Sequence, residues 1–297
     1  MITVQSLEKS FGSLKAVDSV SFSLAPGETF GLLGPNGAGK STTISMLVGI
    51  LKPDRGEIRI KGELATDSAL ARAQIGIAPQ SLSLYEDLTA TENLAFFGKL
   101  YGLKSAHLKS RIETCLDFAG LADRKHDRVS TYSGGMKRRL NMAVAIIHEP
   151  QLVVFDEPTV GVDPQSRNHI FDCIERLKRE GRTILYTTHY MEEAQRLCDR
   201  VAIMDKGKIL DVDTVDALLL RHGGLSLLEV QVDDAEVSRV SDMGTMKNGS
   251  LAVRSDDPLA LVLRLHERGV AFRSLSVRRP DLEAVFLNLT GRRLRDE

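Results

Sequence analysis

The segment GPNGAGKS at residues 34–41 restricts the fold of this 297-residue chain more than any other feature. It matches the phosphate-binding pattern G-x-x-x-x-G-K-[ST], and it lies between the buried apolar run TFGLL and a helical pattern from Ser41 to Gly49. In such a strand–loop–helix, glycines let successive backbone N–H groups face a phosphate. Lys40 can then reach the β and γ phosphates of a nucleotide, and the Ser41 hydroxyl can reach Mg²⁺. The segment therefore predicts a nucleotide site at the end of a buried strand.

The rest of the first two thirds of the chain predicts an α/β fold. Residues 2–33 are expected to form short strands, and residues about 86–150 to be mostly helical, with Thr89 and Glu92 as a capping box. Three β-rich runs alternate with helical segments: LVVF (152–155), TILYTT (183–188) and VAIM (201–204). Such alternation is typical of a mainly parallel sheet covered by helices on both faces.

The last quarter of the chain reads as a separate small module. RHGGLS (221–226) is a plausible linker, and beyond it strand-like runs surround a helical pattern from Pro258 to Arg268. The chain ends with the short amphipathic pattern DLEAVFLNLTG. We therefore expect a nucleotide-binding domain over 1–220 and a compact α+β accessory or dimerisation module over 225–297.

A second nucleotide motif is LVVFDEP, in which a buried strand ends at two neighbouring acids. In an open α/β sheet, ligands bind beyond the carboxyl ends of the parallel strands. Asp156 is expected to serve Mg²⁺. Glu157, one residue farther on, is the candidate base for a water that attacks the γ-phosphate.

The segment STYSGGMKRRLN (130–141) looks like another anion cradle, because it combines a hydroxyl and two glycines with a helix start. One phosphate-binding loop suffices for one ATP, so this cradle is surplus within a single chain. We expect a symmetric dimer in which Ser133 and Gly135 of each subunit face the γ-phosphate held by the other.

Taken together, the phosphate-binding loop (P-loop), YSGGM, VVFDEP and TTHYMEEA resemble the nucleotide-binding subunit of an ATP-binding-cassette (ABC) transporter, over residues 1 to about 220. The resemblance implies a P-loop NTPase fold with a mainly parallel core sheet and a helical signature subdomain. It also implies an ATPase that uses ATP and Mg²⁺.

The resemblance assigns roles to individual residues of the ATP site. Phe11 would stack on adenine, and His189 would sense the γ-phosphate. Gln80 would touch Mg²⁺ and the attacking water, next to the transmembrane contact, so that Ser41, Gln80 and Asp156 would serve the metal and Glu157, His189 and Gln80 the reaction. The loop residues expected to bind ATP are Gly34, Pro35, Asn36, Gly37, Ala38, Gly39, Lys40, Ser41 and Thr42.

The family signature corresponds to Ser133, Gly134 and Gly135, and Asp163 corresponds to the aspartate at the dimer seam. Tyr132 and Met136 replace the leucine and glutamine that are commoner at the ends of this signature. Methionine has no hydrogen-bond donor in its side chain. Any side-chain donor function at position 136 is therefore lost.

Within the family, LYEDLTATENLAFFGKLYGL (84–103), YSGGMKRRL and the ending DLEAVFLNLTGRRL are similar to ATPases of ABC-2 type exporters, the drug-resistance and polysaccharide or lipid export group. The resemblance implies an export motor on the cytoplasmic face of the membrane, working as a homodimer or with an equivalent second ATP-binding subunit. It also implies a permease that is a separate transmembrane chain. DLEAVFLNLTG can equally be read as an ordinary amphipathic terminal helix.

Other functional classes fit less well. Chromosome and repair cassettes carry a long coiled coil between the positions of Gln80 and Ser133, and residues 81–132 have no sustained heptads. Translation-factor types carry two cassettes, and a P-loop kinase has no use for SGG or TTH. A cassette ATPase that regulates a membrane complex without transport stays open as the alternative.

Composition adds bounds rather than a function. The net charge of -1 gives no electrostatic reason to expect nucleic acid as a partner. Cys115, Cys173 and Cys198 lie far apart, which predicts reduced thiols and no metal site. The N-terminus has no signal-peptide pattern, and no apolar run approaches the roughly 20 residues that span a bilayer. We therefore expect another chain to supply any membrane span.

Overall fold

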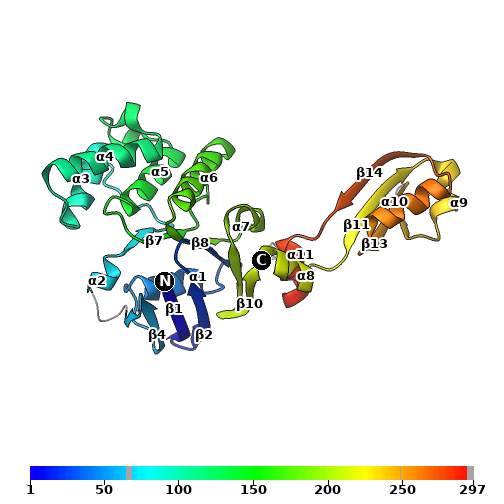
Figure 1. The fold of residues 1–297 in the computed structure, drawn as a ribbon, viewed down its shortest axis with the longest axis horizontal. Coiled ribbons are helices and arrows are strands. Elements are labelled where there is room, and N and C mark those ends of the chain that lie inside the picture. The colour runs from blue at the N-terminus through cyan, green and yellow to red at the C-terminus, as the bar shows by residue number, and fades with distance from the viewer. Residues whose placement is uncertain (65–68, 248, 293–297) are drawn as a thin grey trace. The chain divides into compact units, whose positions relative to one another are not determined.

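The computed structural model describes residues 1–64, 69–247 and 249–292 (Figure 1). The chain forms two compact units, one from Met1 to Thr214 and one from Val215 onward. The unit boundary differs from the expected one at 220–225, because helix α8 (Val215–His222) packs against α11 (Leu282–Thr290) in the second unit. Residues 293–297 of the expected module lie outside the described residues.

The first unit is built on a six-stranded sheet with the order β10-β9-β3-β8-β7-β6. Its neighbouring strands are parallel except for the antiparallel pair of β9 and β10. The strands are β3 (Thr29–Leu33), β6 (Ile75–Ala78), β7 (Leu152–Asp156), β8 (Thr183–Thr188), β9 (Arg200–Asp205) and β10 (Lys208–Thr214). Strands β3, β7 and β8 are buried along their whole length, as expected for a parallel sheet covered on both faces. The α/β fold class is therefore confirmed.

A second, antiparallel sheet of the order β2-β1-β4-β5 lies beside the first. Its strands are β1 (Ile2–Phe11), β2 (Leu14–Leu24), β4 (Arg55–Ile60) and β5 (Glu63–Leu64). The prediction of short strands over residues 2–33 was wrong here, because β1 and β2 form one long hairpin around the turn at Gly12 and Ser13. Gly12 has φ +59° in this turn, a conformation that glycine adopts without strain.

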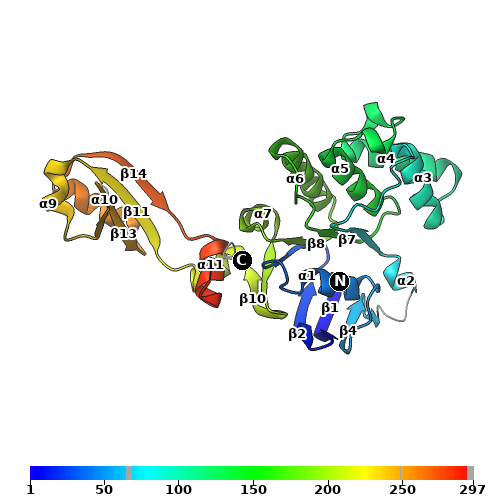
Figure 2. The same ribbon diagram turned by 180° about the vertical axis from the view of Figure 1, so that it is seen from behind.

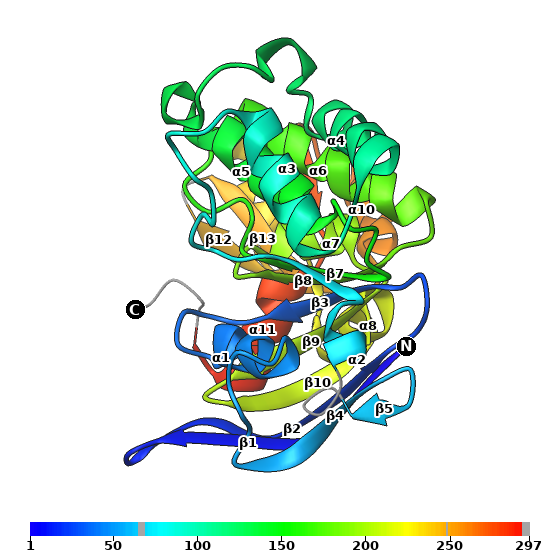
Figure 3. The same ribbon diagram turned by 90° about the vertical axis from the view of Figure 1, so that its left-hand side faces the viewer.

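Helix α1 (Lys40–Leu47) begins at the end of the P-loop and lies between the two sheets (Figure 3). Ile44, Met46 and Leu47 are buried in one apolar core with residues of both sheets, among them Val20 of β2 and Leu32 of β3. This packing fixes the start of α1, and thereby Lys40, against the parallel sheet.

The helical segment leaves the sheet after β6 and returns to it at β7 (Figure 2). Thr89 and Glu92 form the predicted capping box at the start of α3, in which the Thr89 hydroxyl accepts from Glu92 N–H and the Glu92 carboxylate accepts from Thr89 N–H. The α-helices after β5 in this unit are α2 (Ala69–Arg72), α3 (Ala90–Leu100), α4 (Ser105–Ala119), α5 (Gly134–Ala145), α6 (Pro164–Arg179) and α7 (Met191–Leu197), with short 3₁₀ turns at Ala122–Arg124 and Val129–Thr131.

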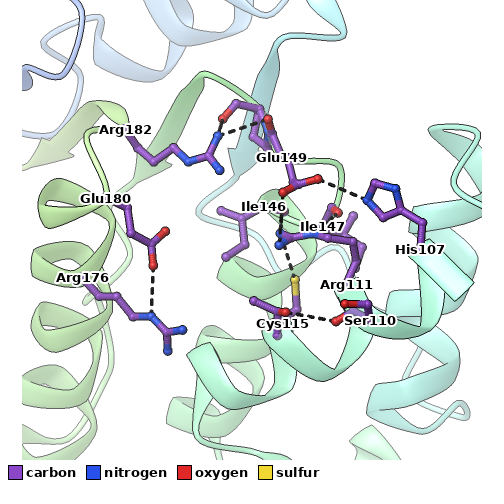
Figure 4. Close-up of polar contacts among 12 residues, drawn as sticks. His107, Ser110, Arg111, Cys115, Ile146, Ile147, Glu149, Arg176, Glu180 and Arg182 are labelled. Atoms are coloured by element: carbon purple, nitrogen blue, oxygen red, sulfur yellow. Dashed lines mark hydrogen bonds and ion pairs between the residues drawn. The ribbon is translucent and has the colours of Figure 1, made fainter.

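Two arginines fix the junction between α5 and β7 (Figure 4). Arg111 of α4 donates to the carbonyls of Ile147 at 3.2 Å and Ile146 at 2.9 Å, where α5 ends. Arg182 donates to the carbonyls of Glu149 at 3.3 Å and Pro150. These bonds satisfy carbonyls that a helix end would otherwise leave unpaired, and they set the direction in which the chain enters β7.

The second unit contains an antiparallel sheet of the order β12-β13-β11-β14. Leu228, Val230 and Leu251 of this sheet form an apolar core with Leu261 and Leu265 of helix α10. The elements are β11 (Ser226–Val232), a 3₁₀ turn (Asp234–Glu236), α9 (Val237–Val240), β12 (Thr245–Lys247), β13 (Ser250–Ser255), α10 (Pro258–Glu267) and β14 (Phe272–Arg278). None of the helices in the described part of the chain is long and apolar enough to cross a membrane.

Candidate functional site

A cavity of about 640 Å³ opens between the β1–β2 hairpin and the P-loop. Its volume lies within the usual range for small-molecule and cofactor sites, roughly 300–1,000 Å³. The predicted residues that line it are Phe11, Asn36, Gly37, Ala38, Gly39, Lys40, Ser41, Thr42, Gln80 and Glu157. Phe11 ends β1 and is 49% exposed, so its ring is open to a ligand. Most of the residues that the sequence assigned to ATP therefore meet in one cavity.

The P-loop glycines are required by close backbone contacts. A Cβ on Gly34 would lie 2.1 Å from the carbonyl oxygen of Met204. Gly39 has φ +103°, and a Cβ there would lie 2.4 Å from the carbonyl oxygen of Ala16. The loop is thus pressed against β2 on one side and the end of β9 on the other, and only glycine fits at these two positions.

Lys40 points back into the loop that precedes it. Its ammonium group donates to the carbonyls of Gly34 at 2.7 Å and Pro35 at 3.0 Å. The same Nζ lies 3.1 Å from Glu157 Oε1, and both side chains are about 5% exposed or less. The buried ammonium group thus has three protein oxygens around it, as burial of a charged group requires.

The two acids after β7 are held by the neighbouring strand β8. Thr187 donates its hydroxyl to Asp156 Oδ1 at 2.6 Å. The backbone N–H of Glu157 donates to the hydroxyl and the carbonyl of Thr187, at 3.0 and 3.2 Å. Glu157 has φ +47°, an uncommon backbone conformation for a side chain of this kind. Its carboxylate is therefore aimed by the fold and not by chance.

Three side chains from distant parts of the sequence converge on Glu157. Lys40 contacts Oε1, as described above. Gln80 Nε2 donates to Oε2 at 3.4 Å, and His189 Nδ1 lies 3.3 Å from Oε2 without the geometry of a hydrogen bond. Gln80 follows β6 and His189 follows β8, so the carboxyl ends of neighbouring parallel strands bring these groups together.

The oxygen atoms near the Glu157 carboxylate are suitable ligands for a hard divalent cation. The Ser41 hydroxyl lines the cavity, and Asp156 supplies a nearly buried carboxylate. Gln80 offers an amide oxygen from the end of β6. Mg²⁺ prefers oxygen ligands, and it is usually held by one or two protein carboxylates together with substrate phosphates and water. The residues present fit such an ion.

The SGG segment lies outside this cavity. Ser133 is the N-cap of α5, where its hydroxyl accepts from the backbone N–H of Met136 at 3.3 Å. Ser133 and Gly134 are exposed. Gly135 packs against α6, and a Cβ there would lie 2.1 Å from the hydroxyl of Ser166. The structure therefore does not bring this segment to the P-loop of its own chain.

Asp163, the predicted dimer-seam aspartate, also lies outside the cavity. It caps α6 by accepting from the backbone N–H of Ser166 at 2.9 Å, and this bond lowers the pKa of the exposed carboxyl. The start of α6 therefore lies directly beside the SGG segment, because Ser166 is the residue that Gly135 contacts.

The two departures from the usual signature have structural roles. The Tyr132 ring is buried, and its hydroxyl donates to the carbonyl of Arg124 at 2.6 Å. Met136 contributes its backbone N–H to the helix cap at Ser133, which any residue other than proline can do.

The sequence did not predict three lysine and glycine residues that also line the cavity. Lys206 and Gly207 form the tight turn between β9 and β10 and line the cavity together with Lys15. The Gly207 N–H donates to the carbonyl of Ala38 at 2.9 Å, and the Gly207 carbonyl accepts from the backbone N–H of Asp18 at 2.8 Å. A glycine such as Gly207 between two strand-like runs is a turn signal, but the place of this turn beside the P-loop follows from the sheet order.

Comparison with known proteins agrees with this site. The family described as ABC transporter matches residues 17–160. The chain is 42% identical to the Linearmycin resistance ATP-binding protein of Bacillus subtilis (strain 168), over 100% of both proteins. It is also 42% identical to the Nod factor export ATP-binding protein I of Rhizobium sp. (strain N33), over 99% of this chain and 98% of that protein.

Solved structures give the same result. An ATP-binding subunit of an ABC transporter is similar with a TM-score of 0.68 and 32% identity, over 75% of this chain and 93% of that chain. A dimeric ATP-binding cassette in a post-hydrolysis state, bound to ADP and Pi, is similar with a TM-score of 0.66 and 25% identity, over 72% of this chain and 98% of that one. The chain therefore belongs to the ABC transporter family, as an ATP-binding subunit that hydrolyses ATP.

Proposed function

We propose that this chain is the motor subunit of an ABC-2 type exporter, in which ATP-driven closure of a dimer moves a separate transmembrane permease. The convergence of Lys40, Gln80 and His189 on the Glu157 carboxylate, at the edge of a cavity lined by the P-loop, is the observation that carries the ATP-hydrolysing part of this proposal. The names of the relatives, one an export protein and one a resistance protein, favour export over uptake.

Each residue of the site then has a task in hydrolysis. Residues Gly34 to Thr42 hold the phosphates, with the Lys40 ammonium on the β and γ groups. Ser41, Asp156 and Gln80 would hold Mg²⁺, which would supply charge neutralisation at the phosphates. Glu157 accepts the proton of the attacking water, and His189 contacts the γ-phosphate. Phe11 stacks on the adenine at the mouth of the cavity.

The position of the SGG segment supports a dimer. Ser133 and Gly134 are exposed and lie at the N-terminus of the twelve-residue helix α5, away from the cavity of their own chain. In an isologous dimer they can reach the ATP of the partner subunit and stabilise its γ-phosphate with backbone donors. Asp163 would then lie at the seam between the two subunits.

The face beside α3 supports docking of a permease. Tyr85, Phe96 and Leu100 are exposed, and a groove beside them is lined by Glu92, Ala95, Phe96, Lys99 and Leu100. This face lies only a few residues after Gln80 in the sequence, so a partner bound there would be linked to the ATP site by a short stretch of chain. Such a partner would hold the chain at the cytoplasmic face of the membrane, and no nucleic acid is required.

The central test is the substitution Glu157→Gln. It keeps the size of the side chain but removes the base, so turnover of ATP should fall by about 10²-fold or more while ATP binding is retained. The protein should then accumulate as an ATP-bound dimer, measured by size-exclusion chromatography with ATP and Mg²⁺. Glu192 is an exposed glutamate on α7 and provides the matched control, so Glu192→Gln should keep parental turnover.

Two further measurements separate the levels of the proposal. Lys40→Ala should lose ATP binding or hydrolysis, and retained ATPase at saturating ATP would contradict the P-loop assignment. Export itself requires that the chain purifies from membranes with a multi-span permease whose cargo stimulates the ATPase. Isolation with a membrane complex that moves no cargo would favour the regulatory alternative.

A further inference from the structure

Glu193 is a buried carboxylate that the ATP chemistry does not use. It lies in the TTHYMEEA motif, on helix α7, and its side chain is 0% exposed. It does not line the ATP cavity. A charged group in such a place must be paired and hydrogen-bonded, so its partners indicate what it holds in position.

The two carboxylate oxygens of Glu193 contact different elements. Oε2 accepts from the Tyr186 hydroxyl at 2.7 Å and the Thr188 hydroxyl at 2.8 Å, both on β8. Oε1 lies 2.9 Å from Arg167 Nε of α6, in an ion pair that lacks the direction of a hydrogen bond. Glu193 therefore joins α6, α7 and the end of β8 at one point.

This junction surrounds the loop that carries His189. The Thr188 hydroxyl, which donates to Glu193, also accepts from the backbone N–H of Tyr190 at 2.9 Å. The Tyr190 ring lies against the His189 ring, with 4.1 Å between the ring centroids, and the Arg167 guanidinium lies 5.1 Å from the Tyr190 centroid. The residues on both sides of His189 are thus tied to the Glu193–Arg167 pair.

Arg167 is itself fixed by the start of α6. Its backbone N–H donates to the carbonyl of Asp163 at 2.9 Å, in the turn whose Ser166 packs against Gly135. Packed contacts therefore lead from the SGG segment to the His189 loop within one chain. Such contacts can carry a change of position from one site to another when the elements are rigid.

We propose that Glu193 is a positioning residue that, through Thr188 and Arg167, holds His189 in the geometry required for ATP hydrolysis. This inference rests on the proposed function, because it takes His189 as the residue that contacts the γ-phosphate. Glu193 does not touch the nucleotide. Its effect is to limit the positions of the His189 ring, and a displacement of about 1 Å in a reacting group can cost about 10²-fold in rate.

The Tyr186 and Thr188 hydroxyls both donate to Glu193 Oε2, so their removal makes a matched pair of variants. Thr188→Val removes the hydroxyl that accepts from the Tyr190 N–H, whereas Tyr186→Phe removes the other hydroxyl that donates to Glu193. Thr188→Val should lower kcat about 10-fold or more, with KM for ATP within about twofold of the parent. Tyr186→Phe should keep kcat within about threefold, since the link to His189 is intact. Equal losses in both variants would make Glu193 a structural carboxylate and overturn the proposal.

A second variant covers the case in which Thr188→Val fails to fold. Glu193→Gln keeps an oxygen that accepts from both hydroxyls but ends the ion pair with Arg167. It should also lower kcat about 10-fold or more and leave the Kd for ATP near the parental value. Parental kcat in a folded Glu193→Gln protein would overturn the proposal.

The deciding measurement combines these changes with His189→Ala. If Glu193 acts only through His189, neither Thr188→Val nor Glu193→Gln should lower the residual ATPase of His189→Ala any further. A full additional loss in the double variants would overturn the inference alone. Parental ATPase in the single His189→Ala variant would instead contradict the role that the proposed function gives to His189.

Discussion

At the scale of single residues, the two acids of the site depend on Thr187 of the neighbouring strand β8. Glu157 keeps an unusual backbone conformation because its N–H donates to both the hydroxyl and the carbonyl of Thr187. The same Thr187 hydroxyl donates to the carboxylate of Asp156. The pair of acids is therefore rigid before any ligand contacts it. Preorganisation of this kind stabilises a transition state without reorganisation at the moment of reaction.

One protonation effect in the helical segment is at His148. Its ring stacks on Tyr101 with 3.6 Å between the centroids, and burial lowers the pKa of His148 to about 4 from the ordinary 6.5. Between pH 4 and pH 6.5, the unfolded chain therefore binds a proton at this histidine and the folded chain does not. The stability contributed by the neutral ring is complete above pH 6.5 and is lost as the pH falls toward 4.

His148→Phe should keep the stacking and remove this titration. Each pKa unit is worth about 1.4 kcal/mol, so the parent should lose about 3 kcal/mol more unfolding free energy than the variant between pH 7 and pH 4. Urea denaturation at a series of pH values measures the difference. The exposed His126 serves as a control, because His126→Gln should follow the parent. An identical pH dependence in parent and His148→Phe would show that the partly buried imidazole does not titrate as described.

The sequence predicted those residues whose chemistry demands a fixed spacing. Lys40, Asp156 and Glu157 follow buried strands, and a parallel sheet brings such strand ends to one edge, so their meeting could be foreseen. The Glu193–Arg167 pair could not, because it depends on how α6 and α7 pack against each other. Lys206 was missed for a similar reason, since its place in the cavity follows from the order of the strands.

At the scale of elements, two helix starts form one surface. The N-caps Ser133 of α5 and Asp163 of α6 lie together because Gly135 lets Ser166 approach closely. The sequence predicted the capping box of α3 and the strands β3, β7, β8 and β9, since these are local patterns, but it did not predict β6 or β10. It did not predict the length of the β1–β2 hairpin, because several register shifts interrupt the alternation of buried residues.

Ser133→Arg tests the role of the α5 start. A bulky cation in a place sized for a hydroxyl should block closure on the ATP of the partner, while the P-loop of the same chain is untouched. In a Glu157→Gln background, in which dimers should accumulate, the variant should bind ATP with an affinity within about twofold of that background and elute as a monomer. Ser110→Arg, at an exposed serine of α4, should still dimerise. Dimerisation of the Ser133→Arg protein at parental ATP concentrations would refute the proposed cross-subunit role.

At the scale of the whole molecule, each unit has an apolar core of its own. The large core of the first unit draws only on residues before Thr214, and the small core of the second lies between its sheet and α10.

All three cysteines are free and buried in the first unit. Burial raises the pKa of Cys115 and of Cys173 to about 12, so these thiols are protonated at neutral pH.

A chain that ends at Thr214 should therefore fold and bind ATP with an affinity within about twofold of the full-length chain. We expect the second unit to stabilise assembly rather than chemistry. The truncated protein should need about tenfold more protein to form the ATP-dependent dimer, which corresponds to about 1.4 kcal/mol. Analytical ultracentrifugation of both proteins in a Glu157→Gln background gives this comparison. Loss of ATP binding by a folded truncated protein would place the second unit within the site.

The pairing of β6 with β7 has a consequence for how such a chain can change. Ile75 is paired with Leu152, and Ala78 with Phe155, so the helical segment leaves and rejoins the sheet at neighbouring strands. Its two attachment points are independent of the length and shape of what lies between them. Residues 79–151 could therefore be exchanged for the equivalent stretch of a relative, provided that Gln80 and the SGG segment are kept. Lys40, Asp156 and Glu157 lie outside this stretch and would keep their places.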